Sequence, residues 1–329
     1  MNINEAQKKL NETLFGYLDI EEKKKIIDSI TENDINLNDI TFYDPIAFDL
    51  KINPLEFFYN TGTKHLSDEA KYLIKLGYNI NTNDNERNNT ILHLSIIHND
   101  LETVNYLLEQ NANPFIYNLY KDNAIKLLIE RSMLEPLKKA IDLNKDQINK
   151  LNEFDKERIL TGLMYVKEYD EFVNIVETLQ CLNLDYFQPL NVESGYNNLA
   201  IACLSRKYFE HTHFLIDNFY NTKSECDYQS TNTLQKIFED INFFVLDDDV
   251  LTAKQEFELE QLKSLSISMI NKGANPYIKN KHDEQAIDYL VGEPENELFR
   301  NSLISTYEKN IIDKSMNLNS TIKHSKKRI

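Results

Sequence analysis

The residues that could do chemistry are few and scattered along the chain. Of the seven histidines, His211 and His213 lie closest together, but on a helix two residues at this spacing diverge by about 200°, so one face cannot offer both to a metal. The cysteines at positions 181, 203 and 226 form no Cys-x-x-Cys pattern. Cys203 lies in a run of small and apolar residues, which favours a buried filler over a nucleophile.

The acidic residues also lack a catalytic or metal-binding pattern. Asp247, Asp248 and Asp249 are consecutive, whereas a calcium-binding EF-hand loop spaces its carboxylates at alternate positions and ends in a glutamate. Neither a phosphate-binding P-loop nor a Gly-x-Ser-x-Gly nucleophile motif is present. We therefore predict that the protein is not an enzyme, and we predict no cofactor, metal or small-molecule substrate.

Composition narrows the class of partner. The 329 residues include 53 Asp and Glu against 36 Lys and Arg, a formal net charge of −17. This acidity argues against coating nucleic acid, because neutralising phosphates requires clustered Lys and Arg. No stretch approaches the roughly 18 apolar residues of a membrane span, and the N-terminus lacks the features of a secretory signal. We expect a cytoplasmic protein.

Internal repeats indicate the elements that position these residues. Residues 112–116 (ANPFI) recur at 274–278 (ANPYI), and apolar positions from 91 to 108 recur at an offset of 33 residues. Each unit has the pattern of two short helices, such as 90–98 and 101–110. Asn111 ends the second helix at a position that favours a left-handed backbone, where Gly77 and Gly273 stand in other units.

These motifs resemble those of the ankyrin repeat. Residues 90–93 (TILH) resemble the family's TPLH opening, and residues 111–114 (NANP) and 273–276 (GANP) resemble its GADP turn. The motifs extend over 44–145 and 264–290. The resemblance implies an all-α fold, an α-solenoid of about seven helix-turn-helix repeats with short hairpin loops and helical caps at both ends. It also implies that His93 orders the turn between neighbouring repeats.

The pattern divides the chain into three parts. Residues 1–43 form a helical cap, residues 44–312 form the array, and residues 313–329 form a basic tail that we expect to be disordered. An insertion near 238–262 is expected to interrupt a helix pair, and residues 298–312 to cap the last repeat. The inner helices are predicted to start near Asn53, Thr90, Asn123, Arg158, Asn198, Thr233 and Gln285.

The resemblance implies a function in binding another protein through the concave face and the hairpin tips. Carried over by position, the partner-binding residues of the concave face are Phe57, Asn60, Thr61, Leu94, Ile97, His98, Leu127, Glu130 and Arg131. Those of the hairpin tips are Asn83, Asp84, Asn85, Glu86, Asn118, Tyr120, Lys121, Asn280, Lys281 and His282. Because the body without its basic end carries a charge of about −22, we expect a partner with a basic patch.

Two alternative functions remain open at this point. Residues 10–30 faintly resemble an F-box, which would make the protein an adaptor that recruits a ubiquitin ligase. An unrecognised enzyme site in the 238–262 insertion is the other. The AT-rich residue usage and basic tail also resemble those of ankyrin-repeat effectors that intracellular bacteria deliver into host cells, which would place the protein in a host cytosol.

Overall fold

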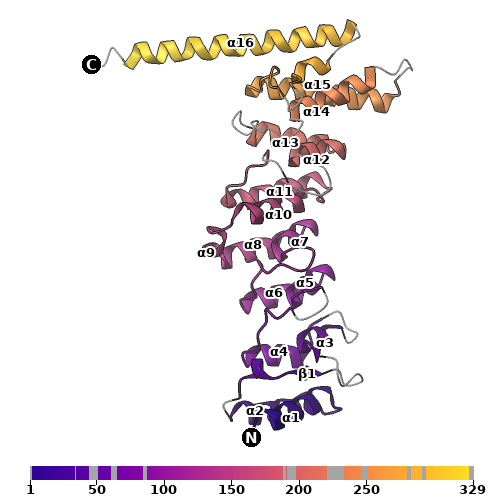
Figure 1. The fold of residues 1–329 in the computed structure, drawn as a ribbon, viewed down its shortest axis with the longest axis vertical. Helices are drawn as coiled ribbons and strands as arrows, with labels where there is room; N and C mark the ends of the chain where they lie inside the picture. The colour runs from indigo at the N-terminus through magenta and orange to yellow at the C-terminus, as the bar shows by residue number, and fades with distance from the viewer. Residues whose placement is uncertain are drawn as a thin grey trace. The chain divides into compact units, whose positions relative to one another are not determined.

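The computed structural model describes residues 2–33, 35–43, 51–60, 65–83, 87–187, 190, 198–220, 233–245, 251–279, 283–290 and 294–325. The chain divides into two compact units, Met1–Gly162 and Leu163–Ile329. The fold is all-α, with helices following one another in pairs along each unit (Figure 1). Strands are limited, in these ranges, to the short antiparallel pair β1 (Phe42–Tyr43) and β2 (Lys51–Ile52).

The first unit is a stack of helix layers. Helices α3, α5 and α7 pack successively against one another, and α6 packs against α8, so that two rows of helices run through the unit. At its start, α1 packs on α2, which in turn contacts α4. The helices are α1 (Ile3–Phe15), α2 (Ile20–Thr31), α3 (Pro54–Asn60), α4 (Asp68–Lys75), α5 (Ile91–Ile97), α6 (Leu101–Glu109), α7 (Ala124–Glu130), α8 (Leu134–Leu143), α9 (Lys145–Ile148) and α10 (Glu153–Leu163), with a 3-10 turn η1 (Leu37–Asp39).

Side-chain caps start these helices where the sequence predicted. The side chain of Thr90 accepts the backbone N–H of His93 at the start of α5, and that of Asn123 accepts the N–H of Lys126 at the start of α7. The predicted start at Arg158 is wrong, because α10 begins at Glu153. Asn152 and Asp155 exchange side-chain to backbone hydrogen bonds of 2.9 and 3.0 Å there, and this reciprocal cap fixes the earlier start.

Residues in the left-handed backbone region end the helices of corresponding repeats. Gly77, Asn111 and Gly273 have φ angles of 90°, 62° and 99°. This confirms the prediction from their spacing, since glycine and asparagine tolerate this conformation best.

The second unit also consists of two rows of helices. Its first row contains α12, α14 and η3, and its second row contains α11, α13 and α15, followed by α16. The predicted helix starts at Asn198, Thr233 and Gln285 lie at the starts of α12, α14 and η3. The elements are α11 (Tyr169–Leu179), η2 (Gln180–Leu182), α12 (Leu199–Ser205), α13 (Phe209–Phe219), α14 (Thr233–Val245), α15 (Ala253–Lys272), η3 (Ala286–Tyr289) and α16 (Pro294–Ser325).

The segment predicted as an interrupting insertion is helical on both sides of residues 246–250. It lengthens the helix pair, so that α14 and α15 have 13 and 20 residues, against 7 and 9 in α5 and α6. The two long helices lie side by side (Figure 1). The residues added near 238–262 thus extend both helices of this pair, since on either side of 246–250 the segment keeps helix-forming residues.

The end of the chain is helical over part of the segment predicted to be disordered. Helix α16 runs past residue 312 to Ser325, into the segment predicted to be disordered, because no proline or glycine follows Pro294 to stop it. Leu303 is buried, and the side chain of Asn310 donates to the carbonyl of Ile270 at the end of α15. Among the described residues, no helix is long and apolar enough to cross a membrane.

Candidate protein-binding surface

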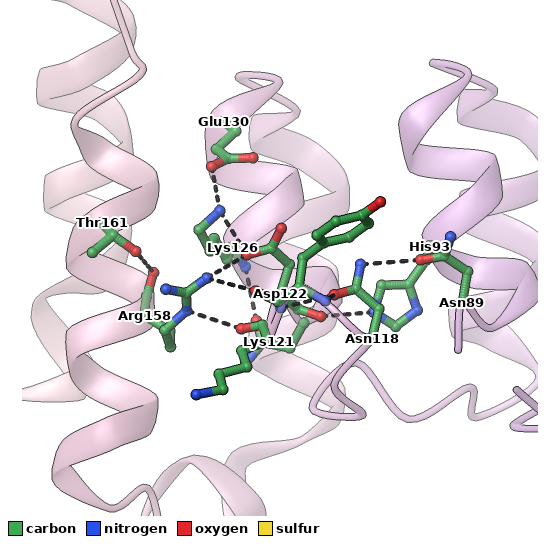
Figure 2. Close-up of polar contacts among 11 residues, drawn as sticks. Asn89, His93, Asn118, Lys121, Asp122, Lys126, Glu130, Arg158 and Thr161 are labelled. Carbon is green, nitrogen blue, oxygen red and sulfur yellow. Dashed lines mark hydrogen bonds and ion pairs between the residues drawn. The ribbon is translucent and has the colours of Figure 1, made fainter. Parts of the chain in front are cut away.

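The hairpin between α6 and α7 is held by a buried asparagine. The side-chain carbonyl of Asn118 accepts the backbone N–H groups of Tyr120 and Asp122, both at 2.9 Å. Its amide donates to the side chain of Asn89 in the preceding loop at 3.0 Å (Figure 2). The hairpin therefore has its turn fixed from within and is tied to the neighbouring repeat.

His93 links the same two repeats. Its Nδ1 accepts the backbone N–H of Thr90 at 3.1 Å, so the ring proton lies on Nε2, which donates to the carbonyl of Asp122 at 3.2 Å (Figure 2). The side chain is fully buried, and burial lowers its pKa, which keeps the ring neutral. This confirms the structural role predicted for His93 and leaves no ring nitrogen for catalysis.

Arg158 on α10 reaches across to the hairpin from the following repeat. Its Nε donates to the carbonyl of Lys121 at 2.9 Å, and its Nη2 donates to the carbonyl of Tyr120 at 3.2 Å and to the carboxylate of Asp122 at 2.6 Å (Figure 2). Charge-assisted bonds of this kind are stronger than neutral ones. Arg158 thus fixes the backbone of the hairpin tip at Tyr120 and Lys121, whose side chains are exposed.

A buried lysine completes the network behind this surface. Lys126 on α7 pairs with Asp122 at 2.9 Å and with Glu130, and its side chain is 8 % exposed. Burial raises the pKa of Glu130, although the positive charge of Lys126 opposes that shift. Glu130 is therefore an internal partner of the network.

The network leaves a small set of side chains exposed around the inner helices and the hairpin. Tyr120 is 60 % exposed, and His98, Lys121 and Arg131 are exposed beside the ends of α5 and α7. Leu94 and Ile97 on α5 are half-buried.

Several predicted binding residues lie elsewhere than expected. Asn118 and Leu127 are buried, each 7 % exposed, so the prediction that they face a partner is wrong: one holds the hairpin and the other packs in the core. Phe57 is half-buried and packs edge-on against Phe15 of the cap, and Asn83 is half-buried. The side chain of Asn60 lies outside the described part of the structure. The other predicted residues lie outside it entirely: Thr61, Asp84, Asn85, Glu86, Asn280, Lys281 and His282.

Sequence reasoning missed Arg158 and Asp122. They pair across 36 positions, and no local pattern marks either as a partner of the other. The sequence offered one signal: a hairpin acid is followed by an arginine on the inner helix of the next repeat. This pattern is too common to single out one pair.

Two other residues considered for catalysis or metal binding, Cys203 and His211, pack among neighbouring side chains. Cys203 is buried, and burial raises its pKa to about 12, which suppresses the thiolate. His211 packs against Phe172 with ring centroids 4.5 Å apart. The described ranges contain no group of three or more His, Cys, Asp or Glu that could hold a metal. Cys226 and the acids Asp247 to Asp249 lie outside those ranges.

The segment that resembles an F-box belongs to the cap. Leu14 is buried, and Phe15 stacks on Phe58 with ring centroids 5.7 Å apart. An adaptor function would need these side chains to leave the packing of the first unit, whereas Tyr17 and Leu18 are exposed between α1 and α2.

Comparisons with known proteins agree with this architecture. The family model "Ankyrin repeat" matches residues 87–119, which contain α5, α6 and the start of the braced hairpin. Among solved structures, the ankyrin repeat domain of Bcl-3, described as a member of the IkappaB protein family, matches with a TM-score of 0.50. It is 16 % identical and covers 70 % of this chain and 92 % of its own. No curated protein sequence matches.

Proposed function

We propose that the chain is an ankyrin-repeat protein and that it acts as a non-catalytic module that binds another protein. The binding surface lies around α5, α7 and their hairpin, and it consists of the exposed side chains of His98, Tyr120, Lys121 and Arg131 with the half-buried side chains of Leu94 and Ile97. Stacked repeats bury their own apolar faces, which leaves the inner helices and hairpins free for a partner.

One observation carries this proposal: Tyr120 is 60 % exposed on a hairpin whose backbone is fixed by Asn118 and Arg158. Aromatic and arginine side chains dominate binding energy at protein interfaces. A side chain presented by a rigid backbone loses little conformational entropy on binding. Tyr120 therefore has the properties of a preorganised anchor, with Lys121 and Arg131 nearby in sequence to add polar contacts.

Net charge supports a further property of the partner. The chain carries −17 overall, and complementary charge raises the rate of encounter. We propose a partner with a basic patch, for which association slows as salt is raised through the physiological range. Association that is insensitive to salt would contradict this part of the proposal.

The test compares two variants of the intact protein as baits in a eukaryotic cell lysate. The first changes the surface through Tyr120→Ser, Lys121→Asn and Arg131→Ser; asparagine is chosen because position 121 has a φ of 59°. The matched control changes exposed residues of α8, which belongs to the other row of helices, and of α9, which follows α8. Its substitutions are Leu143→Ser, Lys138→Asn and Lys145→Ser. Circular dichroism verifies that both variants fold.

We expect the control to capture the same protein as the unmodified chain and the surface variant to lose it, by more than about tenfold in affinity for a hot-spot aromatic. Equal capture by both variants would place the binding surface elsewhere. A captured ubiquitin-ligase scaffold that depends on Tyr17 and Leu18 would support the adaptor function.

A further inference from the structure

The lengthened helix pair of the second unit borders an open pocket of about 290 Å³. Its walls come from α14 and α15, from the end of α12, and from the turn that leads into α13. Small-molecule sites usually measure about 300–1,000 Å³, so this volume suits a single side chain better than a larger ligand.

The floor and rim of the pocket are apolar and aromatic. Leu204 and Leu262 are buried, whereas Phe243 on the rim is 68 % exposed, with Phe244 beside it at a centroid distance of 6.0 Å. An exposed phenyl face next to charged groups can bind the aliphatic part or the planar head of a cationic side chain.

A buried carboxylate lies in the same wall. The side chain of Glu258 on α15 is 6 % exposed and pairs with the ammonium of Lys207 at 2.6 Å. Lys207 itself is 58 % exposed and sits in the turn between α12 and α13 with a φ of 63°. The buried partner is therefore the acid, and its present cation can return to water at little cost.

The opposite wall contributes a second acid. Asp240 on α14 pairs with Lys236 at 2.7 Å, and Glu239 lies 3.8 Å from the same ammonium. Of these three residues, Asp240 and Lys236 line the pocket, so its wall holds two carboxylates, each with a lysine beside it. Next to the pocket, burial raises the pKa of Glu239, while the positive charge of Lys236 opposes that shift.

We propose that this pocket binds an arginine side chain of a partner polypeptide, with the guanidinium between Glu258 and Asp240 and its plane against Phe243. A guanidinium offers five donors in a flat fork, is weakly hydrated, and stacks on aromatic rings, whereas an ammonium does none of these as well. In the complex, the arginine takes the place of Lys207 at Glu258. The proposal concerns the second unit alone and does not depend on the surface around Tyr120.

The probe is a fluorescein-labelled peptide that has one arginine between two leucines in a Gly-Ser background. Matched peptides carry citrulline, which has the same shape without the charge, or lysine or glutamate at the same place. Fluorescence anisotropy with the full chain measures the affinity of each peptide. We expect the arginine peptide to bind about tenfold more tightly than the citrulline peptide, with lysine between them and glutamate weakest.

Variants separate the pocket from general attraction to an acidic protein. Glu258→Gln with Asp240→Asn should remove the preference for arginine over citrulline. Phe243→Ser, which alters an exposed residue, should weaken the arginine peptide, whereas the control Phe257→Ser, 60 % exposed on α15 and outside the pocket lining, should not. Equal binding of arginine and citrulline peptides, an unchanged preference in the double variant, or equal effects of the two phenylalanine variants would each overturn the proposal.

Discussion

Two regions of the chain hold a mostly buried carboxylate against a lysine, and they leave the lysine in opposite environments. In the hairpin of the first unit, Asp122 is paired with Lys126, whose side chain is 8 % exposed, and with Arg158. In the lengthened helix pair of the second unit, Glu258 is paired with Lys207, whose side chain is 58 % exposed.

The difference in lysine exposure distinguishes a structural ion pair from one that a ligand can replace. The side chains of the two cations around Asp122 are largely buried, 8 % exposed for Lys126 and 19 % for Arg158, so these pairs stabilise the surface that carries Tyr120. Lys207 can release Glu258 without disturbing a packed helix. The same pair of residue types thus supports a rigid binding surface in one region and a replaceable ligand contact in the other.

The largest expected effect comes from neutralising each acid. Asp122→Asn should lower the free energy of unfolding by about 2 kcal/mol, because a charged hydrogen bond is lost to each of two largely buried cations. Glu258→Gln should cost less than about 1 kcal/mol, because its cation is already solvated. Urea unfolding measures both values. Equal losses of unfolding free energy in the two variants would contradict the proposed difference between the two ion pairs.

A second, smaller effect concerns pH and the neutral His93 in the braced region. Burial lowers the folded-state pKa of His93 below its unfolded value of about 6.5. The contribution of neutral His93 to the free energy of unfolding is therefore fully present above pH 6.5. It is lost as the pH falls toward the folded-state pKa, by up to about 1.4 kcal/mol per pH unit for one proton.

Unfolding curves between pH 8 and pH 5 check this effect against the variant His93→Gln, which should show a shallower loss of stability. His211 and His213 in the second unit also have pKa values lowered by burial, so part of the loss should remain in the variant. Identical pH profiles would show that His93 does not titrate with folding.

The smallest expected effect distinguishes Lys121 from Lys207, two lysines of the described ranges that have a left-handed backbone. Lys121→Gly should raise the free energy of unfolding by about 0.5 kcal/mol, because glycine removes steric strain that exceeds its own entropic cost. Lys207→Gly gains the same relief but leaves the buried Glu258 carboxylate without its cation, so a net loss of about 1 kcal/mol is expected. Urea unfolding gives both signs, and a gain at both positions would contradict the role of Lys207.

Local features of the fold could be predicted because each depends on residues close in sequence. Thr90 caps α5 and binds His93 three positions later, and Asn111 takes a left-handed conformation after its helix. The wrong start at Arg158 shows the limit of this approach. The apolar pattern of α10 is weak, and its start is fixed by Asn152 and Asp155 rather than by the repeat period.

Exposure within a repeat could be predicted only in part. By position in the family pattern, Leu127 and Arg131 are equivalent candidates for the concave face, yet one is 7 % exposed and the other lies in solvent. The difference depends on what the adjacent repeats place over each residue, and the repeat motif does not contain that information.

The sequence by itself determined the repeat architecture, the helix caps and the acidic character of the protein, because these follow from local propensity, periodicity and composition. Only the tertiary structure decided that Arg158 braces the hairpin of the preceding repeat, and that residues from four elements line an open pocket beside Glu258. The physical reason is distance along the chain: the pairs Arg158–Asp122 and Lys207–Glu258 are 36 and 51 positions apart. Such contacts form only when stacking of the helices brings their residues together.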